Sequence, residues 1–213
     1  MIRILVAGEG ALLRAGIRFT LKQEAGFEIV AEAETVSQIN AVLETRPVDV
    51  VVLGIYQTHL SGLETLRSIR RATKCPVLIV STHASDIYAV RLIKAGANGY
   101  LTRSSPPEEL IRAVWRLSTG KLYIRGGVAE MLAEALAGPG SADTSQPLHD
   151  VLSDRELQVV CFIAFGKTLS EIAVTMGLSA KTISTYRARA LEKLHMRTNA
   201  ELTRYAIENL LVD

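Results

Sequence analysis

The stretch from Leu178 to Leu194, LSAKTISTYRARALEKL, constrains the fold of this chain most strongly. Its larger apolar side chains recur every three or four positions, so they share one face of a predicted helix. They are Ile183, Tyr186, Ala190, Leu191 and Leu194. The opposite face carries no bulky apolar group and no carboxylate. It consists of Lys181, Ser184, Thr185 and Ala188.

This second face has the chemistry of a surface that enters a DNA groove. A positive charge, short hydroxyls and a methyl group can approach phosphates and base edges. The candidate DNA contacts are Lys181, Thr182, Ser184, Thr185, Arg187, Ala188, Arg189 and Lys193, with Thr168 from the preceding helix start. The alternative is an ordinary helical hairpin whose basic face is only solvated.

Capping signals place a second helix directly before this one. Thr168 and Glu171 form a predicted capping box that opens a helix to Met176, and Gly177 can end it in a left-handed conformation. Ser179 is a good N-cap for the next helix. Two helices joined across so short a turn predict a helix-turn-helix.

The run LSDRELQVV…GKTLSEIAVTMGLSAKTISTYRARALEKL resembles the LuxR-type helix-turn-helix of the NarL/FixJ group of bacterial response regulators. The resemblance begins at about Leu152 and implies an all-α, four-helix DNA-binding domain with Leu169–Ala188 as its bihelical core. Two further capping boxes, at Ser153/Glu156 and Thr198/Glu201, predict the starts of its first and last helices.

Strands and helices alternate through the first half of the chain, which is typical of a parallel sheet covered by helices on both faces. The predicted strands are Ile2–Ala7, Phe27–Glu32, Asp49–Leu53, Pro76–Val80 and Gly99–Leu101. The predicted helices are Ala11–Glu24, Val36–Thr45, Leu63–Ala72, Asp86–Ala95 and Pro106–Leu117. We expect domains at 1–120 and 148–213, joined by residues 121–147, which include a short helix and a Gly- and Pro-broken linker, Gly138–Pro147.

This first half resembles the receiver domain of two-component signalling, a flavodoxin-like fold with a five-stranded parallel sheet. The resemblance rests on IRILVA at the start, Arg14-Ala15-Gly16, DVVVL, Gly62-Leu63-Glu64 and the run from Lys94 to Leu101. In that family an acidic pair helps to hold Mg²⁺, an Asp accepts the phosphoryl group, and a Ser or Thr and a Lys contact its oxygens.

The corresponding residues here are altered. The acidic pair falls on Gly8 and Glu9, the phospho-acceptor on Gly54, the hydroxyl on Ser81 and the lysine on Arg103. Glycine offers no nucleophile, and a single carboxylate is a poor Mg²⁺ site. We therefore expect a degenerate phosphorylation pocket without a metal or cofactor, in which Arg103 pairs with Glu9 across the space that Gly54 leaves.

Composition adds little to this interpretation. The net charge of +2 over 213 residues is small, and Cys75 and Cys161 lie in separate apolar contexts without metal-binding spacing. We expect a cytoplasmic protein with no membrane segment and no enzymatic activity. The resemblance implies a transcription regulator that binds double-stranded DNA at an inverted repeat as a homodimer. The candidate dimer surfaces are the last helix, about Asn199–Asn209, and the first and last receiver helices. The alternative is an interaction module that sequesters a kinase or another regulator, with a protein partner at the receiver domain.

Overall fold

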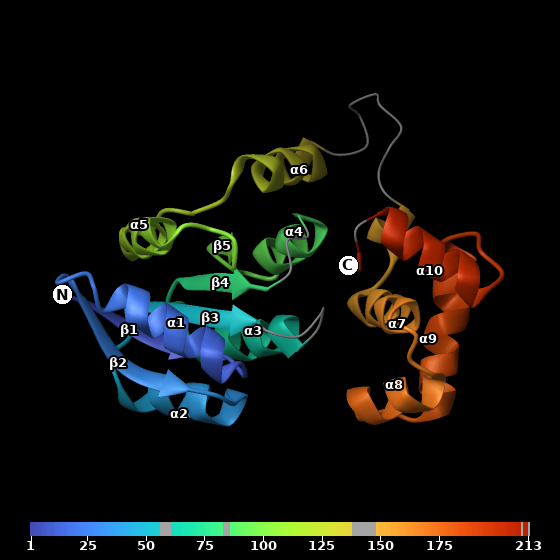
Figure 1. The fold of residues 1–213 in the computed structure, drawn as a ribbon, viewed down its shortest axis with the longest axis horizontal. Coiled ribbons are helices and arrows are strands. Elements are labelled where there is room, and N and C mark those ends of the chain that lie inside the picture. Colours follow the sequence, from blue (N-terminus) through green and yellow to red (C-terminus); the bar gives the residue numbers. More distant parts are fainter. Residues whose placement is uncertain (56–60, 83–85, 138–147, 210, 213) are drawn as a thin grey trace. The chain divides into compact units, whose positions relative to one another are not determined.

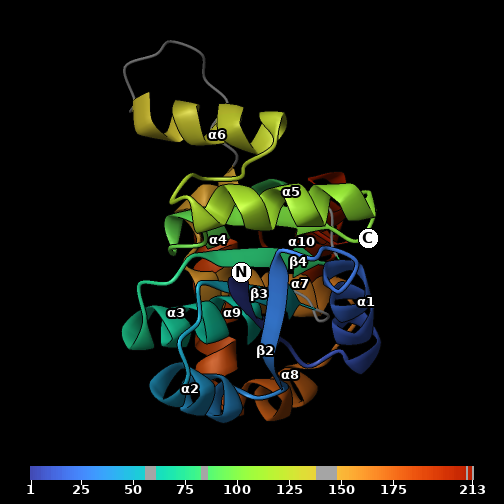
Figure 2. The same cartoon turned by 90° about the vertical axis from the view of Figure 1, so that its left-hand side faces the viewer.

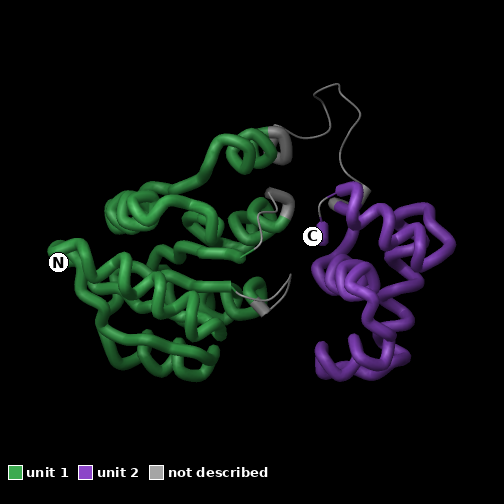
Figure 3. Tube along the Cα trace, viewed as in Figure 1, with its two compact units in different colours: residues 1–138 green, residues 139–213 purple. Residues whose placement is uncertain are grey.

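The computed structural model describes residues 1–55, 61–82, 86–137, 148–209 and 211–212. These residues form two compact units, Met1–Gly138 and Pro139–Asp213, which are coloured separately in Figure 3. The predicted linker Gly138–Pro147 lies outside the described residues.

Unit 1 is an α/β domain built on one parallel sheet (Figure 1). Its strands are β1 (Ile2–Ala7), β2 (Phe27–Ala33), β3 (Val50–Ile55), β4 (Val77–Ser81) and β5 (Gly99–Thr102). They pair in the order β2-β1-β3-β4-β5. The helices between and after them are α1 (Ala11–Leu21), α2 (Val36–Thr45), α3 (Ser61–Ala72), α4 (Asp86–Lys94) and α5 (Pro107–Ser118). The predicted receiver-like fold is confirmed, with element ends shifted by a few residues.

Helices cover both faces of this sheet, which explains why its central strands are almost wholly apolar. On one face α1 and α5 pack against residues such as Val52 and Val80. On the other, α2, α3 and α4 pack against residues such as Leu53 and Ile79. Because all five strands are parallel, their carboxyl ends meet along one edge of the sheet, where open α/β sheets usually place their sites.

A sixth helix, α6 (Gly126–Ala137), belongs to the same unit. Its Val128 is buried in the core that α4 shares, and Met131 and Leu132 pack against that core. Helix α6 packs against α4, above which it is drawn in Figure 1 and in Figure 2. The sequence placed this helix in the connecting segment, whereas its apolar face extends the compact unit beyond residue 120.

Unit 2 is all-α, as predicted. A short 3₁₀ helix, Leu148–Val151, precedes α7 (Asp154–Ala164), α8 (Leu169–Met176), α9 (Ala180–Lys193) and α10 (Asn199–Glu208). Helix α7 packs against both α9 and α10, and α8 packs against α9. The 3₁₀ helix was not predicted, and α10 ends before the predicted Leu211.

Candidate functional site

Capping boxes fix the starts of three helices in unit 2. At α7, the Glu156 amide donates to Ser153 Oγ over 3.3 Å, and the Ser153 amide donates to Glu156 Oε2 over 2.8 Å. The same reciprocal pattern joins Thr168 to Glu171 and Thr198 to Glu201. All three predicted boxes are confirmed.

The backbone turn between α8 and α9 is left-handed, as Gly177 predicted. This glycine has φ +63° and ψ +33°, and its amide bonds to the end of α8. The Leu178 amide then donates to the Ala173 carbonyl over 3.0 Å. Ser179 caps α9 by accepting from the Thr182 amide over 3.1 Å. The two helices therefore form a helix-turn-helix in which backbone hydrogen bonds close the end of α8 and Ser179 caps the start of α9.

Helix α9 has the two faces that its periodicity predicted. Ile183, Ala190 and Leu191 are buried against the rest of unit 2. Lys181, Ser184, Thr185 and Ala188 are all exposed. The small, basic face is therefore free to contact a ligand that approaches unit 2.

The basic side chains around this face differ in how they are held. Lys181 and Arg189 form no side-chain hydrogen bond or salt bridge with the described residues. Arg187 Nε donates to Asn199 Oδ1 over 2.5 Å. Lys193 Nζ lies 2.7 Å from Glu156 Oε2 and also donates to the Val151 carbonyl over 3.2 Å. The charge of Lys193 is thus already balanced within unit 2.

The Glu156–Lys193 salt bridge ties the start of α7 to the end of α9. The Glu156 side chain is only 3% exposed, whereas that of Lys193 is 39% exposed. Burial alone would raise the pKa of the Glu156 carboxyl. The hydrogen bonds from Lys193 and Ser153 outweigh burial, so this pKa lies below its usual value. Sequence reasoning missed the pair because its partners are 37 positions apart.

Three predicted DNA contacts with hydroxyl groups also have structural partners. Thr168 Oγ1 donates to Glu171 Oε2 over 2.8 Å as part of the α8 capping box. Thr182 Oγ1 lies 2.8 Å from Ser179 Oγ at the start of α9. Thr185 Oγ1 donates to the Lys181 carbonyl over 3.0 Å, which leaves its oxygen able to accept another bond.

The altered pocket of unit 1 brings two glycines together at the ends of β1 and β3. Gly8 has φ +130°, a conformation that side-chain-bearing residues rarely adopt. A Cβ atom placed on Gly8 would lie 2.0 Å from the Gly54 carbonyl oxygen. Gly8 therefore fits only because it has no side chain.

The side of Gly54 that faces α1 is occupied by apolar groups. A Cβ atom on Gly54 would lie 3.0 Å from Leu13 Cδ2 and 3.4 Å from Ile17 Cδ1. The hollow that Gly8, Glu9 and Gly54 line, together with Glu34, has a volume of only about 30 Å³. The space expected beside Gly54 is thus largely filled.

The predicted salt bridge between Glu9 and Arg103 is wrong. Both residues are exposed, and neither forms a side-chain hydrogen bond or salt bridge within the described part of the chain. Glu9 lines the 30 Å³ hollow, whereas Arg103 lines a separate pocket between α1 and α5. Ser81 is fully buried, and its carbonyl accepts from the Arg103 amide over 2.9 Å.

Arg14, which the sequence analysis did not assign to the altered pocket, lies beside it. The Arg14 guanidinium donates to the Gly8 carbonyl and lies 3.4 Å from Glu34 Oε2. Its side chain is 13% exposed. The positive charge that approaches Gly8 therefore comes from α1 and not from Arg103.

The described residues contain no group of three or more His, Cys, Asp or Glu side chains that could hold a metal ion. No described helix is long and apolar enough to cross a membrane.

Comparisons with known proteins agree with both units. Residues 4–115 match the family described as "Response regulator receiver domain", and residues 150–206 match "Bacterial regulatory proteins, luxR family". The response regulator UvrY of Escherichia coli (strain K12) is 32% identical over 210 residues, 98% of this chain and 95% of UvrY. The response regulator GacA of Pseudomonas aeruginosa is 32% identical over 100% of this chain and 99% of GacA.

Solved structures show the same fold. RcsB from Salmonella enterica serovar Typhimurium, bound to a promoter, matches with a TM-score of 0.67 at 21% identity, covering 96% of this chain and 97% of that one. The response regulator ChrA of a heme-sensing two-component system matches with a TM-score of 0.52 at 26% identity, covering 99% and 98%. The chain therefore belongs to the bacterial response regulators that combine a receiver domain with a LuxR-family helix-turn-helix domain, and it is a DNA-binding transcription regulator.

Proposed function

We propose that this protein regulates transcription by binding specific DNA sequences through α9, without phosphorylation in its receiver domain. The exposed face formed by Lys181, Ser184, Thr185 and Ala188 carries the DNA-binding part of the proposal. The helix-turn-helix geometry supports it, because such motifs place their second helix in the major groove. A regulator of this kind acts in the cytoplasm, where it meets the chromosome.

The contacts that we propose have distinct roles. Lys181 and Arg189 neutralise phosphates, since their charges have no partner among the described residues. Ser184, Thr185 and Ala188 face base edges. Thr168, Thr182 and Arg187 contact the backbone from the rim of the face. Lys193 is the least available of the proposed DNA contacts, because its ammonium group already forms a salt bridge with Glu156.

The absence of aspartyl phosphorylation follows from two positions. Gly54 has no side chain to attack a phosphoryl group. Gly8 supplies no carboxylate, and Glu9 is exposed at the edge of a hollow of about 30 Å³. Mg²⁺ requires near-octahedral oxygen ligands, usually including carboxylates, and these residues do not fit that requirement. The receiver of this protein is therefore proposed to act without Mg²⁺ and without enzymatic activity.

We further propose a homodimer that binds an inverted repeat. A two-fold symmetric protein matches a two-fold symmetric site, because each copy presents α9 to one half-site. Exposed apolar side chains support two contact surfaces: Ile207 on α10 is 55% exposed, and Phe19 on α1 is 70% exposed. RcsB has been described as dimers bound to DNA.

A DNA titration of matched variants tests the proposal. Lys181→Ala should weaken binding to all sequences and reduce the slope of log affinity against log salt by about one, because it loses one phosphate contact. Thr185→Ala should change the ratio between specific and random DNA. Lys121→Ala, an exposed lysine of unit 1, is the control and should change neither quantity.

Two results would contradict the proposal. If neither α9 variant differs from the Lys121→Ala control, α9 does not read DNA. If genomic fragments bind no better than random DNA, and a kinase or another regulator binds unit 1 instead, the protein is an interaction module.

A further inference from the structure

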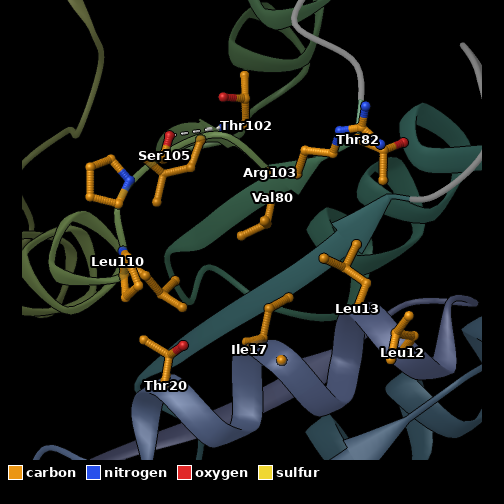
Figure 4. A pocket seen from close by; sticks show the side chains of 14 residues that line it. Leu12, Leu13, Ile17, Thr20, Val80, Thr82, Thr102, Arg103, Ser105 and Leu110 are labelled. Atoms are coloured by element: carbon orange, nitrogen blue, oxygen red, sulfur yellow. Dashed lines mark hydrogen bonds between the residues drawn. The ribbon is translucent and has the colours of Figure 1, made fainter.

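A cavity of unit 1 lies between α1, α5 and the ends of β4 and β5 (Figure 4). Its volume is about 390 Å³, which is within the usual range for small-molecule sites. Leu13 and Ile17 of α1, Val80 and Leu101 of the sheet, and Leu110 of α5 form its apolar walls. These side chains belong to or pack against one core cluster of unit 1, and none of them is among the proposed DNA contacts.

One end of this pocket is polar and positively charged. Thr82 follows β4 and Arg103 follows β5, and the two strands pair so that Ser81 lies opposite Thr102. Figure 4 shows Arg103 and Thr82 at the end of the pocket away from Thr20. Arg103 is the only charged side chain among the described residues that line the pocket, and no Asp or Glu is among them.

The guanidinium of Arg103 is available to a ligand. It forms no hydrogen bond or salt bridge with a described residue, although its backbone amide donates to Ser81. A guanidinium presents two parallel donors to a carboxylate, and such charge-assisted pairs are strong next to apolar surface. An apolar cavity with one unpaired cation at its end is complementary to a molecule with an apolar body and one acidic group.

We propose that this pocket binds a small organic acid, with its apolar body against Leu13, Ile17 and Leu110 and its carboxylate on Arg103. The altered residue at position 103 then has a role of its own. The ligand occupies the α1–α5 side of the receiver, separate from the 30 Å³ hollow at Gly8 and Gly54. The inference concerns ligand binding alone and goes beyond the proposed action on DNA.

Matched probes separate the two halves of the site. The full-length protein is titrated calorimetrically with 1-naphthylacetate and with 2-(1-naphthyl)ethanol, its uncharged counterpart. The acid should bind with one molecule per chain. Arg103→Gln should weaken binding of the acid by about tenfold or more, as expected for the loss of a charged hydrogen bond. The affinity for the alcohol should stay within about twofold of the native value.

A second variant tests the location of the site. Gly16 lines the pocket, and a Cβ atom there would meet nothing within 4 Å, so Gly16→Leu has room for its Cβ and adds apolar bulk at the cavity. It should abolish binding of both probes. Gly126→Leu is the control, because Gly126 also has open space but lies outside this pocket, at the start of α6. It should bind both probes as the native protein does.

Several results would overturn the proposal. They are no binding of the acid, equal loss of acid and alcohol in Arg103→Gln, or unchanged binding in Gly16→Leu. Sedimentation of the same samples distinguishes another occupant. If the acid binds only to monomer and the dimer excludes it, a second copy of the chain fills the pocket and the organic-acid site is wrong.

Discussion

The carbonyl oxygen of Gly54 occupies the place that a side chain on Gly8 would need. A Cβ atom on Gly8 would lie 2.0 Å from that oxygen, and the φ of Gly8, +130°, already disfavours any other residue. The two strands are neighbours, with Ala7 of β1 paired to Leu53 of β3. The loss of a side chain at position 8 is therefore part of how the two strand ends meet.

Gly8→Ala should destabilise unit 1 by about 3 kcal/mol or more, because it adds both a strained backbone and a steric clash. Gly16→Ala is the matched control and should stabilise the unit by about 0.5–1 kcal/mol, since Gly16 is helical with open space around it. Equilibrium unfolding is followed by the fluorescence of Trp115, the single tryptophan, which lies on α5. Equal stability of the Gly8→Ala and native proteins would show that the strand ends separate easily.

Gly54→Asp alone should not restore phosphorylation. The new side chain would have to push Leu13 aside by a few tenths of an ångström, since the Leu13 Cδ2 atom lies 3.0 Å from the added Cβ position. Gly8 would still supply no carboxylate for Mg²⁺. The protein is incubated with acetyl phosphate and Mg²⁺ and its intact mass is measured, with Gly54→Asn as the control. A hydroxylamine-labile phosphoryl adduct on Gly54→Asp, absent from Gly54→Asn, would mean that the pocket remains competent.

Glu156→Gln should destabilise unit 2 by about 1–3 kcal/mol, because it leaves Lys193 without its buried counter-charge while Lys193 keeps partial access to water. Glu192→Gln, on the exposed part of α9, is the control. Hydrogen exchange of the α7 amides in the full chain measures the difference. Unchanged exchange in Glu156→Gln would assign the ion pair no role in holding α7 to α9.

The same ion pair predicts a pH dependence. Folding lowers the pKa of Glu156, so the native state favours the charged carboxylate. The contribution to stability is therefore complete above the ordinary carboxyl pKa of 4.5 and is lost as the pH falls below it. Exchange of the α7 amides should rise on acidification in the native protein more than in Glu156→Gln, after correction for intrinsic exchange. Parallel behaviour of the two proteins would contradict this linkage.

The segment from Leu148 to Asp213 should fold alone, because three capping boxes and a shared core hold its four helices. It should bind DNA more weakly than the full chain, since the receiver helices contribute to the proposed dimer. Circular dichroism and DNA titration of the fragment test both points. Equal affinity of the fragment and the full chain would remove the receiver from the dimer.

Local signals predicted much of this structure. Capping boxes, Gly177 and the periodicity of α9 each act within a few residues, so the sequence displays them directly. The start of β3 was predicted one residue too early, at Asp49, whereas the strand begins at Val50. The Asp49 carboxylate accepts two hydrogen bonds from the Arg3 side chain, at 2.9 and 2.7 Å. This pair holds the pKa of Asp49 at about 2.

Relations between distant residues could not be predicted in the same way. The sequence indicated empty space beside Gly54, but Leu13 packs there and Gly8 approaches from β1. Arg103 and Glu9 were expected to meet because both follow strands, yet they line different cavities. These outcomes depend on how side chains fill space across the sheet, which periodicity does not encode.

The most direct test of the central claim is the affinity of the full-length protein for a selected genomic fragment, measured by fluorescence anisotropy with and without acetyl phosphate and Mg²⁺ at constant ionic strength. Our account predicts the same dissociation constant in both conditions and no phosphoryl adduct in the recovered protein. Tighter binding after treatment, accompanied by a hydroxylamine-labile phosphoryl group on the receiver domain, would contradict it.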